Sequence, residues 1–156
     1  MAADLIKKYI NLGFNNFCVG NIEQAKIIKE IDPNIKIVGS IAMHTTGDKI
    51  LSNLEEYKKY FNSFVLDFSF NKNFSEIKKL PKGFEYMLLA NSSCNIKCEG
   101  DRHWWGDGQS HKCPGIYPNI NYIDSCMIRP TDLHLFQPYI KVFKLQDRGW
   151  PTKSIL

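Results

Sequence analysis

The chain has 156 residues, of which 44% are hydrophobic and 23% are charged, and its formal net charge is +4. A chain of this length forms one domain, here residues 1–156, and can bury a substantial core without disulfides. Lys and Arg are spread along the sequence with no run of five or six like charges, so no polybasic tail is implied, and the mild basicity permits an anionic partner without requiring one. The positive charge is explained by a solvated, lysine-rich surface.

The first ten residues predict the start of an amphipathic helix and not a signal peptide, because they lack a basic end followed by an apolar core. No segment approaches the roughly 18 apolar residues of a membrane span. We therefore expect a cytoplasmic protein that does not bind membranes. In that compartment clustered cysteines are metal ligands or redox groups more often than disulfides.

Apolar residues recur with helical spacing and with strand spacing in alternation. Gly13 is expected to end the first helix, Asn21 to cap the second and Pro81 to close the fourth. The pattern predicts helices over residues 2–12, 21–31, 46–60, 73–80 and 130–136, and strands over residues 14–19, 35–41, 63–68, 84–90 and 139–145. The chain therefore has about five strand-and-helix units.

Strands that alternate with helices at this spacing predict an α/β fold with a parallel sheet. A complete eight-stranded barrel takes about 250 residues. Three arrangements therefore stay open: a partial TIM barrel, a small open sheet, or subunits that complete one another. In parallel α/β folds the functional groups lie at the carboxyl ends of the strands. Two such ends carry His44 and Asp67, which could act as acid and base. A solvated loop histidine is an equally good interpretation of His44.

Residues 91–129 form a long cysteine-rich loop that we interpret as metal-binding. It contains four of the five cysteines, Cys94, Cys98, Cys113 and Cys126. Four thiolates can hold zinc or an iron–sulfur cluster. Structural zinc sites use closely spaced ligands in both halves, whereas here only the first pair is close, which favours the cluster. His103 and His111 keep zinc as an alternative.

The fifth cysteine, Cys18, lies inside an expected strand between Phe17 and Val19. We interpret it as a small buried core residue. The alternative is that it replaces Cys126 as the fourth ligand, because it lies near the end of its strand.

Arginine residues in and after the loop are candidates for binding a carboxylate or phosphate, namely Arg102, Arg129 and Arg148. An arginine of this kind, taken alone, is more often part of a surface ion pair. Trp104 and Trp105 could shield a cluster or stack on a planar substrate, or could simply seal the loop. The sequence contains none of the common nucleotide-binding, zinc-protease or serine-hydrolase motifs.

One stretch resembles the collagenase-like peptidase family (peptidase U-32). The resemblance is carried by Leu88-Leu-Ala-Asn91, Cys94, Cys98, Arg102-His103-Trp104, Cys113, Ile128-Arg-Pro-Thr-Asp132-Leu133, Phe143-Lys144-Leu145 and Arg148. The preceding strands and helices also look like the middle of that family's barrel. The cysteine spacings differ from the family pattern, which leaves the fourth ligand open.

The resemblance implies an iron–sulfur protein in which Cys94, Cys98, Cys113 and Cys126 bind a [4Fe–4S] cluster. It implies redox or hydroxylation chemistry on an RNA base or a small aromatic molecule. The candidate catalytic residues are His44, Asp67, Arg102, His103 and Arg148. The alternatives are a true peptidase, and a zinc-stabilised binding module or truncated barrel without catalysis. In the last case a protein partner or self-association would complete the barrel.

Overall fold

The computed structural model of the protein describes residues 2–43, 45–91 and 126–145. Its elements, in chain order, are α1 (Ala2–Asn11), β1 (Asn16–Val19), α2 (Ile22–Ile31), β2 (Lys36–Gly39), the 3-10 turn η1 (Ile41–Met43), α3 (Gly47–Ser52), α4 (Leu54–Tyr60), β3 (Ser63–Val65), the 3-10 helix η2 (Phe68–Lys72), α5 (Phe74–Lys78), β4 (Glu85–Leu89), the 3-10 turn η5 (Pro130–Asp132), α6 (Leu133–Phe136) and β5 (Val142–Lys144).

Single residues set two helix ends, namely the start of α2 and the end of α1. Asn21 caps α2 by accepting a hydrogen bond from the backbone N–H of Gln24 at 3.0 Å. Gly13 follows the end of α1 with φ +92°, a left-handed conformation in which a side chain would be strained. Both positions agree with the sequence-based prediction.

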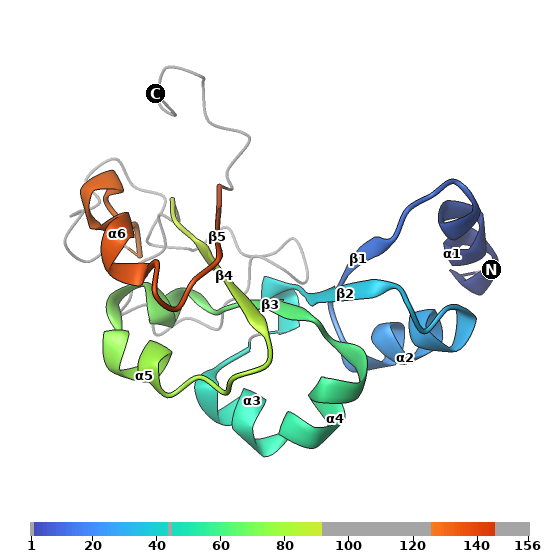
Figure 1. Ribbon diagram of the computed structural model, residues 1–156, viewed down its shortest axis with the longest axis horizontal. Helices are drawn as coiled ribbons and strands as arrows, with labels where there is room; N and C mark the ends of the chain where they lie inside the picture. The colour runs from blue at the N-terminus through green and yellow to red at the C-terminus, as the bar shows by residue number, and fades with distance from the viewer. Residues whose placement is uncertain (1, 44, 92–125, 146–156) are drawn as a thin grey trace, which may run out of the picture.

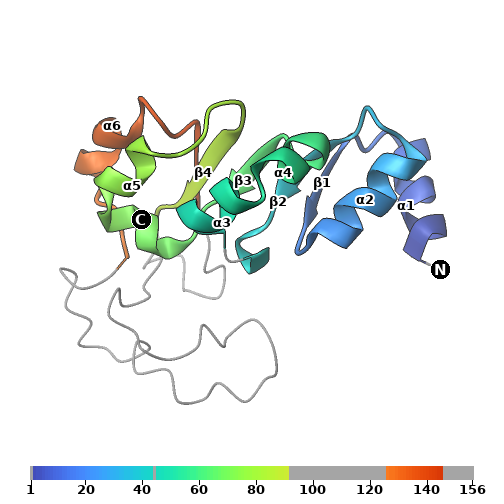
Figure 2. The ribbon, with the colours of Figure 1, turned by 90° about the horizontal axis from the view of Figure 1, so that it is seen from below.

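The five strands form one sheet in the order β1-β2-β3-β4-β5, and every neighbouring pair is parallel. The predicted α/β class is therefore confirmed. The connections from β1 to β2, from β2 to β3 and from β3 to β4 place α2, α3, α4 and α5 on one side of the sheet (Figures 1 and 2). We call the opposite side the helix-free face, because no α-helix of the described residues lies on it, although the 3-10 helices η1 and η2 reach it with Ile41 and Phe68.

The main core lies between the sheet and these helices. Its centre is Phe64 of β3, whose ring packs against the rings of Tyr57, Phe61 and Phe84 at centroid distances of 5.3, 4.9 and 5.1 Å. Gly39 of β2 lies beneath the same ring, because a Cβ atom there would be 2.3 Å from Phe64 Cδ1. The core thus depends on the absence of a side chain at position 39.

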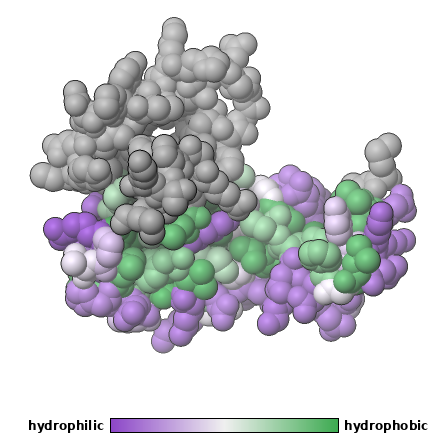
Figure 3. Space-filling model, turned by 90° about the horizontal axis from the view of Figure 1, so that it is seen from above, coloured by the Kyte–Doolittle hydropathy of each residue, from purple (hydrophilic) through white to green (hydrophobic). Residues whose placement is uncertain are grey.

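A second, smaller core lies on the helix-free face. Val65 and Leu89 of β3 and β4 are buried there with Ile41, Phe68 and Cys126, and Val38 and Met87 pack against them. Figure 3 looks onto this side of the molecule, where apolar residues form a band and hydrophilic residues lie at the rim. Successive strand residues therefore contribute to opposite faces, as the pleat requires.

Some predicted details are wrong. The helix expected over residues 46–60 is two helices, because the chain breaks at Asn53. The strand expected over residues 63–68 ends at Val65, since Asp67 turns the chain into η2. Cys18 is exposed on edge strand β1, so its interpretation as a core residue is wrong.

Candidate functional site

Buried polar residues gather at the carboxyl edge of the sheet. Among the residues that the structure describes, four polar side chains are buried, and Thr45, Asp67 and Asn71 follow the ends of β2 and β3. Burying such groups is costly unless they make hydrogen bonds. Three of them in one region therefore indicate a role in organising this edge.

Asp67 has no exposed surface. Its Oδ1 accepts hydrogen bonds from the backbone N–H of Ser69 at 3.0 Å and from the Ser69 hydroxyl at 2.8 Å. Its own backbone N–H donates to the carbonyl oxygen of Thr45 at 3.4 Å. Asp67 therefore caps η2 and joins the segment after η1 to the end of β3. The predicted acid–base role of this residue stays a prediction.

Asn71 makes the link between the sheet and the returning chain. Its Nδ2 donates to the carbonyl oxygen of Leu89 at 2.7 Å and to that of Cys126 at 2.6 Å. Only 2% of the residue is exposed. Two further buried atoms, Asn71 Oδ1 and Thr45 Oγ1, have no hydrogen-bond partner within residues 2–43, 45–91 and 126–145. These two oxygen atoms are therefore available for further hydrogen bonds at this edge of the sheet.

Cys126 lies where the chain rejoins the sheet. The residue is 2% exposed and packs on the helix-free face with Val65 and Leu89. Two positions later, the backbone N–H of Ile128 donates to the carbonyl oxygen of Ala90 at 2.8 Å. The chain therefore crosses the carboxyl end of β4 at Cys126, and that side chain enters the small apolar core.

The sheet register separates Cys18 from this place. Cys18 is level with Val38, Ser63 and Glu85 on the next three strands. Three strand spacings amount to about 14 Å, and the four residues from Glu85 to Leu89 add about 13 Å along the strand. Cys18 is thus about 20 Å from the neighbourhood of Cys126.

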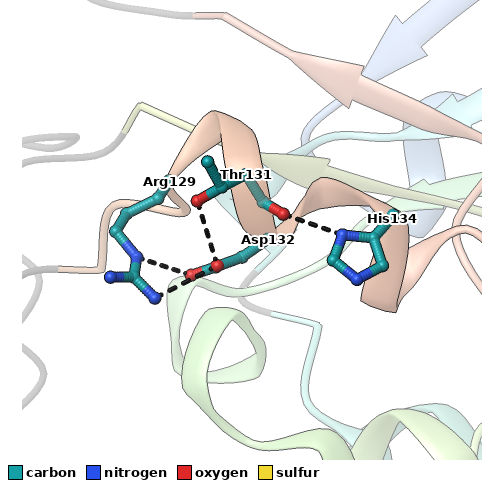
Figure 4. A network of polar contacts seen from close by, with 4 residues as sticks. All are labelled: Arg129, Thr131, Asp132 and His134. Carbon is teal, nitrogen blue, oxygen red and sulfur yellow. Dashed lines mark hydrogen bonds and ion pairs between the residues drawn. The ribbon is translucent and has the colours of Figure 1, made fainter.

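Arg129 is engaged in a surface ion pair. Its Nε donates to Asp132 Oδ2 at 2.8 Å and its Nη2 donates to Asp132 Oδ1 at 3.1 Å, so both oxygen atoms of the carboxylate are bound (Figure 4). The hydroxyl of Thr131 also donates to Asp132 at 3.2 Å. Hydrogen bonds from Arg129 lower the pKa of Asp132 and raise that of Arg129. The ion-pair interpretation of Arg129 is therefore the one that the geometry favours.

The other predicted site residues lie outside the residues that the structure describes: His44, Cys94, Cys98, Arg102, His103, Cys113 and Arg148. Within the described residues, no three His, Cys, Asp or Glu side chains form a group that could hold a metal ion. The sequence reasoning missed Thr45 and Asn71. Asn71 lies between Phe70 and Lys72 in a polar stretch, so the sequence carries no signal that singles it out.

No helix in residues 2–43, 45–91 and 126–145 has the length and apolarity that crossing a membrane requires. No family model, curated protein or solved structure that we compared with this chain matches it.

Proposed function

We propose that this protein binds a [4Fe–4S] cluster through Cys94, Cys98, Cys113 and Cys126, and uses it in redox or hydroxylation chemistry. The observation that carries the proposal is the place of Cys126. It is buried at the carboxyl end of β4, which is the strand end from which the other three cysteines follow in sequence.

The surroundings of Cys126 suit a ligand of such a cluster. Val65, Leu89 and Phe68 surround it with apolar surface. An apolar shell restricts solvent access and so influences the reduction potential of a metal centre. A cluster held there would supply one-electron chemistry. The residues of the chain would orient the cysteine and exclude water from its thiol.

Covalent geometry supports Cys94 as a second ligand and Cys126 rather than Cys18 as the fourth. Cys94 follows Asn91 by three residues, and a chain of three residues spans at most about 10 Å in any conformation. Asn91 directly follows Ala90, whose carbonyl oxygen is bound by Ile128. Cys18 lies about 20 Å from the neighbourhood of Cys126, as the strand register shows.

The substrate class rests on the resemblance to the collagenase-like peptidase family (peptidase U-32), which implies chemistry on an RNA base or a small aromatic molecule. In this proposal the candidate catalytic residues are His44, Asp67, Arg102, His103 and Arg148, and the guanidinium groups of Arg102 and Arg148 bind an anionic group. The alternatives are a peptidase, and a zinc-stabilised module without catalysis.

We also propose that the sheet is part of a TIM-like barrel that a protein partner or a second copy extends. Ten large hydrophobic residues in the described ranges are exposed, and eight lie at the two ends of the sheet. Leu5, Tyr9, Leu12 and Phe14 belong to α1 and its connection to β1, whereas Leu135, Tyr139, Val142 and Leu145 belong to α6, β5 and the residues beside them. Open edges of a parallel sheet are the positions at which further strands add.

A cysteine series tests the proposed ligands. Cys94→Ala, Cys98→Ala, Cys113→Ala and Cys126→Ala are each expected to lower the bound iron of protein purified without oxygen, whereas Cys18→Ala is the matched control and should retain it. Far-ultraviolet circular dichroism of each variant separates loss of the site from loss of the fold. Full iron in the Cys126→Ala variant, or equal loss in Cys18→Ala, would remove the proposed ligand set.

A further inference from the structure

We propose that Asn71 is the positioning residue of this edge, and that its side-chain amide holds Cys126 against the end of β4. The residue is buried, and its single amide nitrogen lies within hydrogen-bond distance of two backbone carbonyl groups. One carbonyl belongs to Leu89, at the end of the strand. The other belongs to Cys126, at the point where the chain returns.

The bond to Leu89 replaces a missing strand donor. Met87 accepts a hydrogen bond from the backbone N–H of Leu66 at 2.9 Å. Carbonyl groups two residues apart point to the same side of a strand, so Leu89 would accept from position 68 if β3 continued. The chain instead turns into η2 after Asp67. The Asn71 side chain reaches back from η2 and supplies the donor.

The orientation of the amide is fixed by its neighbours. Both acceptors are carbonyl oxygens, so a rotated amide would place Oδ1 against two oxygens and make no hydrogen bond. An amide nitrogen has two N–H groups, and both are used here. Asn71 therefore acts as a double donor, a role that the isosteric aspartate cannot fill.

This arrangement holds Cys126 from two sides of β4. On the side of β4 that faces β3, the Asn71 amide donates to the carbonyl oxygen of Cys126. On the side that faces β5, the backbone N–H of Ile128 donates to the carbonyl oxygen of Ala90, and the Ala90 N–H donates to Lys144. The Cys126 thiol is thus seated among Val65 and Leu89. The importance of Asn71 for a metal centre rests on the proposed function. Its role in positioning the Cys126 thiol does not depend on that function.

The test is the alkylation rate of Cys126 in the folded full-length chain, measured by iodoacetamide labelling and peptide mass spectrometry. Asn71→Asp removes both donors at constant shape and should raise the Cys126 rate about tenfold or more, since each lost buried hydrogen bond is worth about a factor of ten. The exposed Cys18 is the internal reference and should not change. Asn62→Asp is the matched control, because the Asn62 side chain accepts from Ile37 N–H at 2.9 Å and aspartate keeps that acceptor.

Labelling is carried out on protein purified without oxygen and again after iron has been removed with a chelator. A raised Cys126 rate in Asn71→Asp in both samples supports the positioning role even if no iron was bound at the start. Bound iron together with an unchanged Cys126 rate would overturn the positioning role while the proposed function stands. An equal rise in Asn62→Asp would also overturn it.

A second measurement needs no substitution, in case Asn71→Asp does not fold. The side-chain amide hydrogens of Asn71 should exchange with deuterated water at least tenfold more slowly than those of Asn62 in nuclear magnetic resonance spectra. Exchange of the two amides at the same rate would show that the Asn71 donors are not held, and would overturn the proposal.

Discussion

The side-chain nitrogen of Asn71 lies 2.6 Å from the carbonyl oxygen of Cys126, although 55 positions separate the two residues in sequence. Together with the bonds to Leu89 and Ala90, this contact joins the point where the chain leaves β4 to the point where it returns. Holding the ends of a segment of about 36 residues costs about 3 kcal/mol of chain entropy. Three hydrogen bonds of about 1 kcal/mol each offset that cost.

Replacing Asn71 by alanine should lower the free energy of unfolding by about 2–3 kcal/mol, because two buried carbonyl groups lose their donor. Urea denaturation followed by circular dichroism measures the change. Asn53→Ala is the control, since the Asn53 amide also donates two hydrogen bonds but is exposed. A loss no larger than that of the control would contradict the structural role assigned to Asn71.

Replacing Gly39 by alanine should destabilise the fold by about 1–3 kcal/mol, the usual cost of overpacking. The added Cβ would lie 2.3 Å from Phe64 Cδ1 and 3.0 Å from Met43 Sδ. The Phe64 ring has no room to move, because three other aromatic rings surround it. The expected result is a lower midpoint of thermal unfolding.

Gly20→Ala is the control for Gly39→Ala, because the nearest atoms to a Cβ at position 20 are 3.8 and 3.9 Å away. It should leave the midpoint of thermal unfolding nearly unchanged. Equal midpoints for the two variants would show that the contact between Gly39 and Phe64 does not limit the packing of this core.

Tyr86 should make the protein sensitive to alkali. Its hydroxyl donates to the carbonyl oxygen of Pro81 at 2.6 Å, and burial raises the pKa of Tyr86 above its ordinary value. A raised pKa in the folded state means that this contribution to stability is complete below about pH 10 and is lost as the pH rises further. Urea denaturation between pH 7 and pH 11 should therefore show stability falling above pH 10.

Tyr86→Phe should cost about 1 kcal/mol at pH 7, because the hydrogen bond to Pro81 is lost. The difference from the unmodified protein should shrink above pH 10, because the variant lacks the loss that ionisation of Tyr86 causes, whereas both proteins keep the raised pKa of Tyr57. Tyr139→Phe, at an exposed position, should reproduce the behaviour of the unmodified protein. A constant difference between Tyr86→Phe and the unmodified protein across this range would count against the buried hydroxyl as the cause.

The ion pair between Arg129 and Asp132 should be visible in the titration of the carboxyl group. Hydrogen bonds from Arg129 lower the pKa of Asp132, so the contribution of the pair is present above pH 4 and is lost as the pH falls through the lowered value. Arg129→Gln should move the pKa of Asp132 towards its ordinary value. Carbon-13 titration of the carboxyl group measures this shift.

Arg129→Lys is the intermediate case, since an ammonium group keeps the charge but cannot bind both carboxylate oxygens as a planar fork. The pKa of Asp132 in this variant should lie between those of the unmodified protein and Arg129→Gln. The same pKa in all three proteins would mean that the fork geometry in Figure 4 does not govern the titration.

The order of strands and helices was predictable because hydrophobic periodicity reflects which side of each element is buried. Ile37 and Phe64 face the helices while Val38 and Val65 face away, so the strands stood out as continuous apolar runs. The break at Asn53 was not predictable, since apolar residues continue at helical spacing on both sides of it. Local backbone geometry, and not burial, decides that break.

The site was predictable only in outline. The strand pattern placed Asp67 at the end of β3, but it did not predict that the Asp67 carboxylate caps η2. Asn71 was missed because its role depends on carbonyl groups from Leu89 and Cys126, which the sequence does not show to be neighbours. Cys18 was misplaced since a cysteine in a strand gives no sign of whether its strand lies at the edge.

The iron, sulfide and zinc content of the full chain purified without oxygen, together with its absorption spectrum, decides between an iron–sulfur cluster and a structural zinc site. We expect about four iron and four sulfide ions per chain, and a brown sample with a broad charge-transfer absorption band. One zinc per chain in a colourless sample would contradict this expectation and make the cysteines a structural zinc site.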